Sequence, residues 1–173
     1  MSLPTVEALI DKLTQALKPY FPSAQPANEQ PIIVGIETGG YWIAKAIHDA
    51  IAPQTELGHL NISFYRDDFS KSGLHPTVQP SSLPTDIDDK TIILVDDVLY
   101  SGRTVRAAMN EIFDYGRPRR ILLAILIDRG EREIPIQADI VAHSIQLGDG
   151  EHIKLEGPKP MALSIRKAKD NAN

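Results

Sequence analysis

The sequence predicts an α/β fold, with a mostly parallel central sheet flanked by helices. Two apolar runs, residues 92–95 and 121–127, are continuous rather than alternating, which is typical of strands buried on both faces of a parallel sheet. The order of strand, small-residue turn and helix occurs twice along the chain, after Ile36 and after Val95. The 173 residues, 42% of them apolar and 24% charged, predict one globular domain over residues 1–173.

The first third of the chain is predicted to contain a helix, a strand and a second helix. Thr5 can cap the first helix, and Lys18 and Pro19 end it. A strand over Ile32–Ile36 then enters the turn 37–40, which opens the second helix. The first helix has apolar residues at helical spacing, namely Val6, Leu9, Ile10, Leu13 and Leu17.

The middle of the chain is predicted to form a short strand and then a long irregular segment. Leu60–Tyr65 is predicted as the strand. Residues 66–90 show no sustained period, and so long a stretch in a compact domain is typical of a lid. A mobile linker is the alternative.

The second half of the chain begins with the strand at 92–95 and the acids Asp96 and Asp97. A helix follows and ends at Gly116. Further strands are predicted over Ile121–Ile127 and Ala138–Ala142. The apolar side of the helix consists of Val105, Ala108, Met109, Ile112 and Phe113.

The last thirty residues carry weaker patterns. Residues 143–160 are expected to form a loop, Met161–Ile165 to return as an edge strand, and the tail 166–173 to be frayed.

The segment 96–104 has the composition of a site for a sugar phosphate. Ser101, Gly102 and Thr104 lie where a helix begins, so backbone N–H groups, the helix dipole and two hydroxyls can surround a phosphate dianion. Asp96 and Asp97 would repel phosphate but can accept hydrogen bonds from vicinal sugar hydroxyls. A ribose bound across the two acids, with its 5′-phosphate in the turn, would suit both the acids and the anion-binding turn. The alternative is an acidic capping region before an ordinary helix.

These residues resemble those of a known family. The run 92–104, IILVDDVLYSGRT, is similar to the motif with which type I phosphoribosyltransferases bind phosphoribosyl pyrophosphate (PRPP). The continuation to Val141, VRAAMNEIFDYGRPRRILLAILIDRGEREIPIQADIV, resembles the pyrimidine operon regulatory proteins that double as uracil phosphoribosyltransferases. VGIETGGYWIAKAI and SFYRDDF resemble the same family, so the similarity extends from about Ile33 to Val141.

The resemblance implies a type I phosphoribosyltransferase fold, with a flexible lid loop and a small hood. It also implies four groups of site residues. The ribose and its phosphate would be bound by Asp96, Asp97, Val98, Leu99, Tyr100, Ser101, Gly102, Arg103 and Thr104; the pyrophosphate by Thr38, Gly39 and Gly40, with Arg66 and Lys71 of the lid closing over it; and the base near Asp128 and Arg129.

The implied reaction makes uridine monophosphate (UMP) and pyrophosphate from uracil and PRPP. Asp96, Asp97 and Arg66 are the expected catalytic residues. Mg²⁺ would be held mainly through PRPP and water, without a protein cage of its own. Purine-specific relatives commonly have an acid where this chain has Tyr100, which favours a pyrimidine. The family usually has Arg where this chain has Gly39. This chain therefore lacks a positive charge that would contribute either to pyrophosphate affinity or to an RNA contact.

The implied function includes a response of pyrimidine biosynthesis genes to uridine nucleotides. Two alternatives stay open, an RNA-binding attenuation regulator with little catalytic role and a non-catalytic nucleotide sensor. The net charge of −5 does not favour RNA binding. A local basic cluster is expected, either as a solvated face or oligomer contact or for RNA; it consists of Arg117, Arg119 and Arg120, with Arg103 and Arg106 nearby.

Composition limits the remaining possibilities. The chain has no cysteine, which excludes disulfides, thiolate metal sites and a cysteine nucleophile. No apolar run approaches the roughly 18 residues of a membrane span, so no membrane partner and a cytoplasmic location are expected. By resemblance the chain is expected to be a homo-oligomer, a dimer or a tetramer.

Overall fold

A five-stranded parallel sheet forms the centre of the molecule. The computed structural model describes residues 3–62, 80–84 and 86–167. Within them the strand order is β2-β1-β3-β4-β5, and each neighbouring pair is parallel. The predicted fold class is therefore confirmed. The strands are β1 (Ile32–Ile36), β2 (Leu57–Leu60), β3 (Thr91–Leu99), β4 (Arg120–Asp128) and β5 (Ile140–Ser144).

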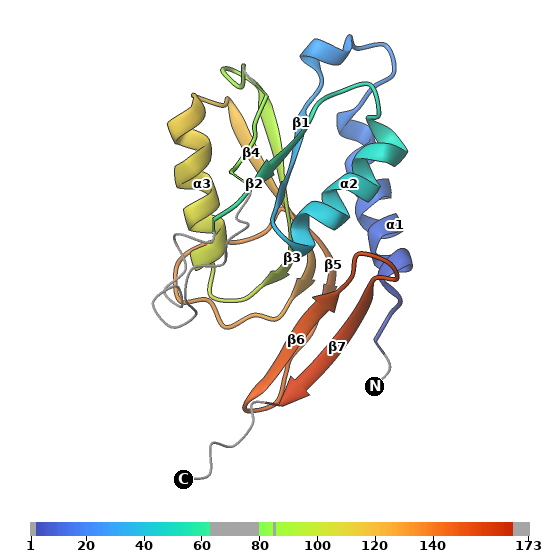
Figure 1. The fold of residues 1–173 in the computed structure, drawn as a ribbon, viewed down its shortest axis with the longest axis vertical. Helices are drawn as coiled ribbons and strands as arrows, with labels where there is room; N and C mark the ends of the chain where they lie inside the picture. Colours follow the sequence, from blue (N-terminus) through green and yellow to red (C-terminus); the bar gives the residue numbers. More distant parts are fainter. Residues whose placement is uncertain (1–2, 63–79, 85, 168–173) are drawn as a thin grey trace.

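Helices cover both faces of this sheet. α1 (Val6–Leu17) and α2 (Gly39–Ile51) lie on one face and α3 (Arg103–Tyr115) on the other (Figure 1). Successive residues of β3 alternate between the two faces. Ile93 and Val95 pack with α1 and α2, whereas Ile92 and Leu94 pack with α3. Burial on both faces explains why the strands read as continuous apolar runs.

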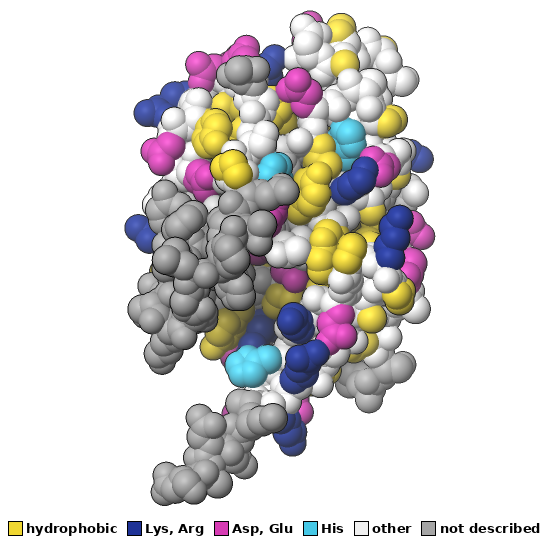
Figure 2. Space-filling view, viewed as in Figure 1, with side chains coloured by type: hydrophobic (Ala, Val, Ile, Leu, Met, Phe, Trp, Pro, Cys, Tyr) yellow, Lys and Arg dark blue, Asp and Glu magenta, His cyan; other side chains and the backbone are white. Residues whose placement is uncertain are grey.

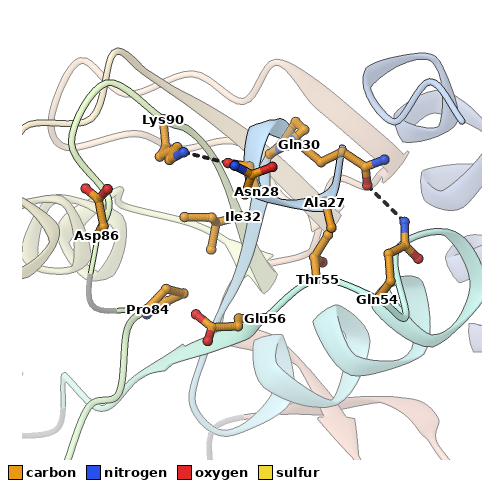
Figure 3. A pocket seen from close by; sticks show the side chains of 11 residues that line it. Ala27, Asn28, Gln30, Ile32, Gln54, Thr55, Glu56, Pro84, Asp86 and Lys90 are labelled. Carbon is orange, nitrogen blue, oxygen red and sulfur yellow. Dashed lines mark hydrogen bonds between the residues drawn. The ribbon is translucent and has the colours of Figure 1, made fainter. Parts of the chain in front are cut away.

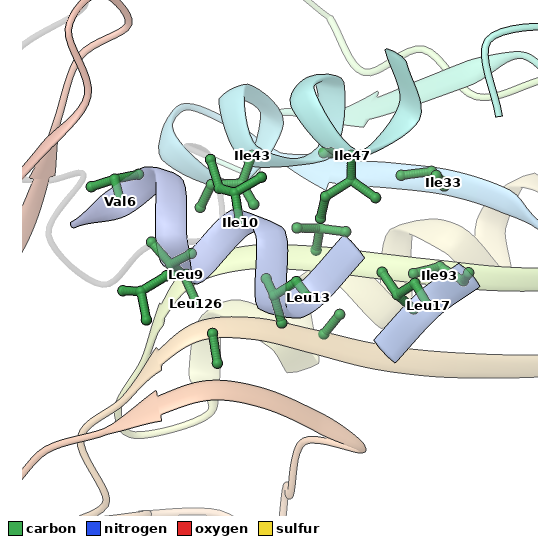
Figure 4. Packing of buried hydrophobic residues seen from close by; sticks show 14 of the residues in the cluster. Val6, Leu9, Ile10, Leu13, Leu17, Ile33, Ile43, Ile47, Ile93 and Leu126 are labelled. Atoms are coloured by element: carbon green, nitrogen blue, oxygen red, sulfur yellow. The ribbon is translucent and has the colours of Figure 1, made fainter. Parts of the chain in front are cut away.

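The first helix forms as the sequence predicts. Thr5 lies before it, and its hydroxyl accepts a hydrogen bond from the N–H of Ala8 at 3.3 Å. Its apolar face packs on Ile43 and Ile47 of α2 and on strand residues such as Ile93 (Figure 4). Two single-turn 3₁₀ helices, Lys18–Tyr20 and Ala27–Glu29, then lead into β1.

The second strand begins earlier than predicted. β2 spans Leu57–Leu60 because the register with β1 pairs Leu57 with Ile33 directly after the α2 connection. The predicted strand Leu60–Tyr65 therefore shares only Leu60 with β2, and residues 63–65 lie outside the described part of the chain.

The end of the predicted lid, residues 80–84 and 86–90, packs against the sheet. Ser82 forms an antiparallel bridge with His59, and its N–H donates to the His59 carbonyl at 2.9 Å. Ile87 is buried, and Asp89 donates its N–H to the carbonyl of Arg117. This end of the segment is thus part of the body, and the preceding residues 66–79 of the predicted lid lie outside the described part of the chain.

The C-terminal region differs from the prediction. Glu151–Glu156 (β6) and Ala162–Lys167 (β7) pair as an antiparallel hairpin, so β6 replaces part of the expected loop and β7 is not an edge strand of the main sheet. Ile153 and Leu155 are buried against the core, which explains why the hairpin forms. The expected frayed tail 166–173 is wrong for Arg166 and Lys167, which pair in β7; residues 168–173 are not described. The hairpin lies at the lower end of the molecule in Figure 1.

Candidate active site

The carboxyl ends of β1, β3 and β4 bring three of the four predicted groups of residues to one edge of the sheet. The turn 37–40 leaves β1, the turn 100–102 leaves β3, and Asp128 and Arg129 stand at the end of β4. The register pairs Leu99 directly with Asp128. Parallel sheets commonly bind ligands at this edge.

The turn after β1 touches the two acids of β3. A Cβ added at Gly39 would lie 2.4 Å from Oδ2 of Asp97. One added at Gly40 would lie 2.6 Å from the carbonyl oxygen of Val95 and 2.9 Å from Cα of Asp96. The turn after β1 therefore lies close against β3, and at Gly40 the atoms in contact are backbone, which leaves no room for a side chain. This close approach also gives a physical reason for glycine at position 39, because a longer residue there would displace the Asp97 carboxylate.

The two acids lie inside β3 rather than after it, as the strand continues to Leu99. Asp96 is buried, with 4% of its surface exposed, and its Oδ1 accepts the N–H of Asp97 at 3.0 Å. Oδ1 of Asp97 accepts the N–H of Val98 at 2.9 Å. The backbone thus fixes both carboxylates, and Oδ2 of Asp97 faces the turn at Gly39.

The turn after β3 leads directly into the first turn of α3. Gly102 adopts a φ of 91°, in the left-handed region, and α3 begins at the next residue. The Ser101 hydroxyl accepts the N–H of Arg103 at 3.3 Å. Tyr100 is 40% exposed. The first turn of α3 therefore opens next to the acids, as the sequence predicts.

The segment after β4 lies along this turn. The N–H of Arg129 donates to the Leu99 carbonyl at 3.1 Å, and the N–H of Glu133 donates to the Ser101 carbonyl at 3.0 Å. The Glu133 carboxylate also accepts from Nε of Arg103 at 2.6 Å. Segment 129–134 thus holds the turn through hydrogen bonds to its carbonyls and to Arg103. No pattern in the sequence indicates this contact.

A cavity of about 560 Å³ lies at the carboxyl ends of β4 and β5. Arg129, predicted beside the base, has its guanidinium 4.0 Å from the centre of the Tyr100 ring. The carboxylate of Asp128 is occupied internally, because Oδ1 accepts from the N–H of Gly130 and Oδ2 from Arg132. The cavity is lined by Asp128, Arg129, Gly130, Glu131, Ser144, Ile145, Gln146 and Leu147.

Arg132 was missed at the level of sequence. Its place between Glu131 and Glu133 indicates a solvated charge, but its side chain is 21% exposed and forms an ion pair with Asp128 at 2.6 Å. A spacing of four residues signals a contact in a helix. Residues 129–136 form an irregular segment instead, so the spacing carries no such signal.

The remaining predictions divide in two. Arg66 and Lys71, the predicted lid residues, lie outside the described residues. The expected basic cluster is split, since Arg103 and Arg106 begin α3 whereas Arg117 follows its far end. The nine helical residues from Ala107 to Tyr115 separate Arg106 from Arg117 by about 16 Å.

A second cavity, of about 340 Å³, lies at the opposite, amino ends of β1 and β2 (Figure 3). Lys90 on its wall donates to the Asn28 carbonyl at 2.6 Å, and Gln54 donates to Gln30 at 3.1 Å. These polar groups are hydrogen-bonded to one another, and the cavity lies at the opposite end of the sheet from the acids of β3.

Within the described part of the chain, no three His, Cys, Asp or Glu side chains meet as a metal-binding group. No helix among the described residues is long and apolar enough to cross a membrane.

The parallel sheet and the packing of the turn after β1 against the two acids of β3 are typical of a type I phosphoribosyltransferase domain. Residues 4–155 match the family model described as phosphoribosyl transferase domain. A hypoxanthine-guanine phosphoribosyltransferase from Bacillus anthracis has the same fold, with a TM-score of 0.59 over 84% of this chain and 83% of that one, at 18% identity.

Relatives of higher similarity define the family more closely. The Bifunctional protein PyrR of Pseudomonas paraeruginosa is 49% identical over 94% of this chain and 95% of its own length. The Bifunctional protein PyrR of Nitrosococcus oceani is 49% identical over 93% of this chain and 91% of its own. The chain belongs to the PyrR family of phosphoribosyltransferases, which confirms the family predicted from its motifs.

Proposed function

We propose that this chain transfers the phosphoribosyl group of PRPP to uracil, which yields UMP and pyrophosphate, and that it also regulates pyrimidine biosynthesis genes. The observation that carries the catalytic part is the contact of Gly39 and Gly40 with Asp97 and Asp96. It supports a site in which the turn at 38–40 binds one anion beside the two carboxylates and the turn at 100–102 binds another. PRPP has the matching order of phosphate, ribose and pyrophosphate.

The residues of the chain have distinct parts in this reaction. Asp96 and Asp97 accept hydrogen bonds from the ribose hydroxyls and place negative potential beside the ring as positive charge develops at C1′. Turn 100–102 and Thr104 bind the 5′-phosphate. Turn 38–40 binds the pyrophosphate, so the bond that breaks is held between two fixed ends.

Mg²⁺ fits the donor set of this site. Carboxylate oxygens are the ligands that Mg²⁺ prefers, and the two acids can also bind its coordinated waters. When bound, the ion would neutralise charge on the pyrophosphate as it departs. We propose that Arg66 and Lys71 add positive charge over the same group and help to exclude water.

Uracil is proposed as the base. Tyr100 takes the place of the acid that purine-specific relatives carry, and Arg129 stacks on its ring. Because both oxygens of Asp128 are occupied internally, we propose that its role is to shape the base-side turn. Backbone groups around the cavity at β4 and β5 would then read the edge of the base.

The direct test is formation of UMP from uracil and PRPP with Mg²⁺, run beside hypoxanthine, guanine and orotate. The proposal expects turnover with uracil and little with the other three bases. No turnover with uracil would contradict the catalytic proposal, and preference for a purine would contradict the assignment of the base.

The regulatory part is proposed from family membership, because the relatives are named bifunctional. A basic surface is present on the hairpin, where Lys154, Arg166 and Lys167 are exposed, and Figure 2 shows Lys and Arg side chains gathered near that end of the molecule. We propose that a homo-oligomer binds the leader RNA of its own operon. A salt-dependent gel shift should show binding that uridine nucleotides strengthen. RNA binding that does not change when uridine nucleotides are added would contradict the regulatory proposal.

A further inference from the structure

Arg132 joins two parts of the site that lie on different strands. One of its terminal nitrogens, Nη1, donates to the Tyr100 carbonyl at 2.9 Å and to the Gly130 carbonyl at 3.0 Å. The other, Nη2, donates to Oδ2 of Asp128 at 2.6 Å, and Nε donates to the Ile136 carbonyl at 3.0 Å. A single planar guanidinium thus holds the turn after β3 to the turn after β4. A planar group with fixed donor directions suits this task better than an ammonium.

Three consecutive carbonyls of the turn after β3 point into segment 129–134. The Leu99 carbonyl accepts the N–H of Arg129, and the Ser101 carbonyl accepts the N–H of Glu133. The carbonyl between them, that of Tyr100, accepts from the Arg132 side chain. The outer two are held by backbone, and the middle one by a side chain that mutation can remove.

The direction of these carbonyls determines where the turn presents its donors. In a trans peptide group the C=O and the N–H point in opposite directions. Carbonyls at 99, 100 and 101 that face segment 129–134 therefore turn the N–H groups of residues 100, 101 and 102 to the opposite side. Successive N–H groups on one side form a concave site for an anion.

We propose that Arg132 is a positioning residue that sets the phosphate affinity of this turn and couples it to the base-side turn at Asp128. The proposal rests on the proposed function, since it assigns the ligand of the turn as the 5′-phosphate of a nucleotide. Arg132 acts through the Tyr100 carbonyl and Asp128, without touching the ligand. Loss of its side chain leaves the peptide group between residues 100 and 101 free to rotate. Phosphate binding must then order this group, which lowers the affinity.

The test compares Arg132→Gln with wild type by calorimetric binding of ribose 5-phosphate, uridine and UMP. Ribose 5-phosphate should bind about tenfold more weakly to the variant, the effect expected for loss of one charge-assisted hydrogen bond. Uridine, which lacks the phosphate, should change less than ribose 5-phosphate does. In the assay, KM for PRPP should rise by a larger factor than kcat falls.

Two further variants make the result specific. Arg132→Lys keeps the charge and can restore one of the lost bonds, so it should recover part of the affinity; it also replaces Arg132→Gln if that variant does not fold. Lys45→Gln is the matched control. It removes a cation that pairs with Asp49 on the exposed side of α2, and it should bind ribose 5-phosphate as wild type does.

The outcomes separate this proposal from the proposed function. If wild type neither binds ribose 5-phosphate nor forms UMP, the proposed function fails and the role of Arg132 fails with it. If wild type does both but Arg132→Gln binds ribose 5-phosphate equally well, the role of Arg132 alone is overturned. A lower melting temperature with equal losses for uridine and ribose 5-phosphate would assign Arg132 a merely structural role and would also overturn it.

Discussion

The two turns of the site share a local pattern but are stabilised in different ways. Each follows a buried parallel strand and opens a helix of thirteen residues. The turn after β1 is shaped by the absence of side chains, because Gly39 and Gly40 lie against the carboxylate and backbone of β3. The turn after β3 is shaped by hydrogen bonds, because segment 129–134 holds its carbonyls.

This difference explains how one site can bind two anions of unlike role. The turn at Gly39 touches Asp97 directly, so the leaving group and the ribose would be bound by residues in mutual contact. The turn after β3 is held on one side by segment 129–134, and we propose that its other side binds a phosphate that stays bound throughout the reaction. Steric substitutions should therefore damage the first turn most, and loss of hydrogen bonds the second.

The largest effect is expected at Asp97, the acid that the turn after β1 contacts. Asp97→Asn keeps the size of the side chain and an oxygen for the N–H of Val98, but removes the negative charge. Turnover of uracil and PRPP should fall by about 10²- to 10³-fold, as for loss of one group that stabilises charge in a transition state. Steady-state assays measure this. An unchanged kcat/KM would remove Asp97 from the reaction.

Substitution of the first turn should separate packing from ligand binding. An alanine Cβ at Gly40 would meet backbone atoms, which cannot move away cheaply, so Gly40→Ala should lose about 1–3 kcal/mol of stability. A misplacement of the turn also costs up to about 10²-fold in rate. Gly39→Ala meets a carboxylate instead, and should lower turnover with a smaller loss of stability. Urea unfolding alongside assays measures both, and equal stability losses would contradict the steric comparison.

The second turn is tested by Gly102→Ala. Gly102 has a φ of 91°, and an added Cβ would lie 3.0 Å from Cγ1 of Ile134. A left-handed residue with a side chain costs about 1–2 kcal/mol before this contact is counted. Gly130→Ala provides the control, since Gly130 has a φ of 73° with no atom within 4 Å of an added Cβ. Urea unfolding should show the larger loss for Gly102→Ala, and the opposite order would show that Ile134 does not restrict the turn.

The smallest effect concerns the hairpin, which lies apart from both turns. The Arg166 guanidinium and the Ser164 hydroxyl donate to the Glu156 carboxylate and lower its pKa. A lowered pKa means that the charged carboxylate is favoured in the folded state. The stabilisation is therefore fully present above the usual carboxyl pKa. It is lost as the pH falls through the lowered pKa. An NMR titration should find this pKa, and Arg166→Gln should return it towards its usual value. A Glu156 pKa that is equal in both proteins would contradict the pairing.

Much of the fold could be predicted from sequence because its information is local. The continuous apolar runs at 92–95 and 121–127 follow from burial on both faces, and Thr5 and Gly116 mark helix ends through their own backbone preferences. The strand predicted over Met161–Ile165 forms as β7, but its partner β6 was missed because its alternation is short and its outer face carries mostly polar residues. Its pairing depends on burial of Ile153 and Leu155 against distant parts of the chain.

The candidate site shows the same division. The acids, the glycines and the turn at 100–102 could be predicted as site residues, because the chemistry of each residue type suits a sugar phosphate at that position. The contact of Gly39 with Asp97 and the bonds of Arg132 join residues far apart in sequence or in an irregular segment, where spacing carries no geometric meaning. Sequence therefore indicates which residues bind ligand better than which residues hold them in place.

A structure of the chain with UMP bound tests the central claim most directly. The account predicts the phosphate of UMP within hydrogen-bonding distance of the N–H groups of turn 100–102 and the first turn of α3, with the ribose hydroxyls at Asp96 and Asp97. A phosphate bound instead at Thr38–Gly40, or a nucleotide bound away from the carboxyl ends of the strands, would contradict it.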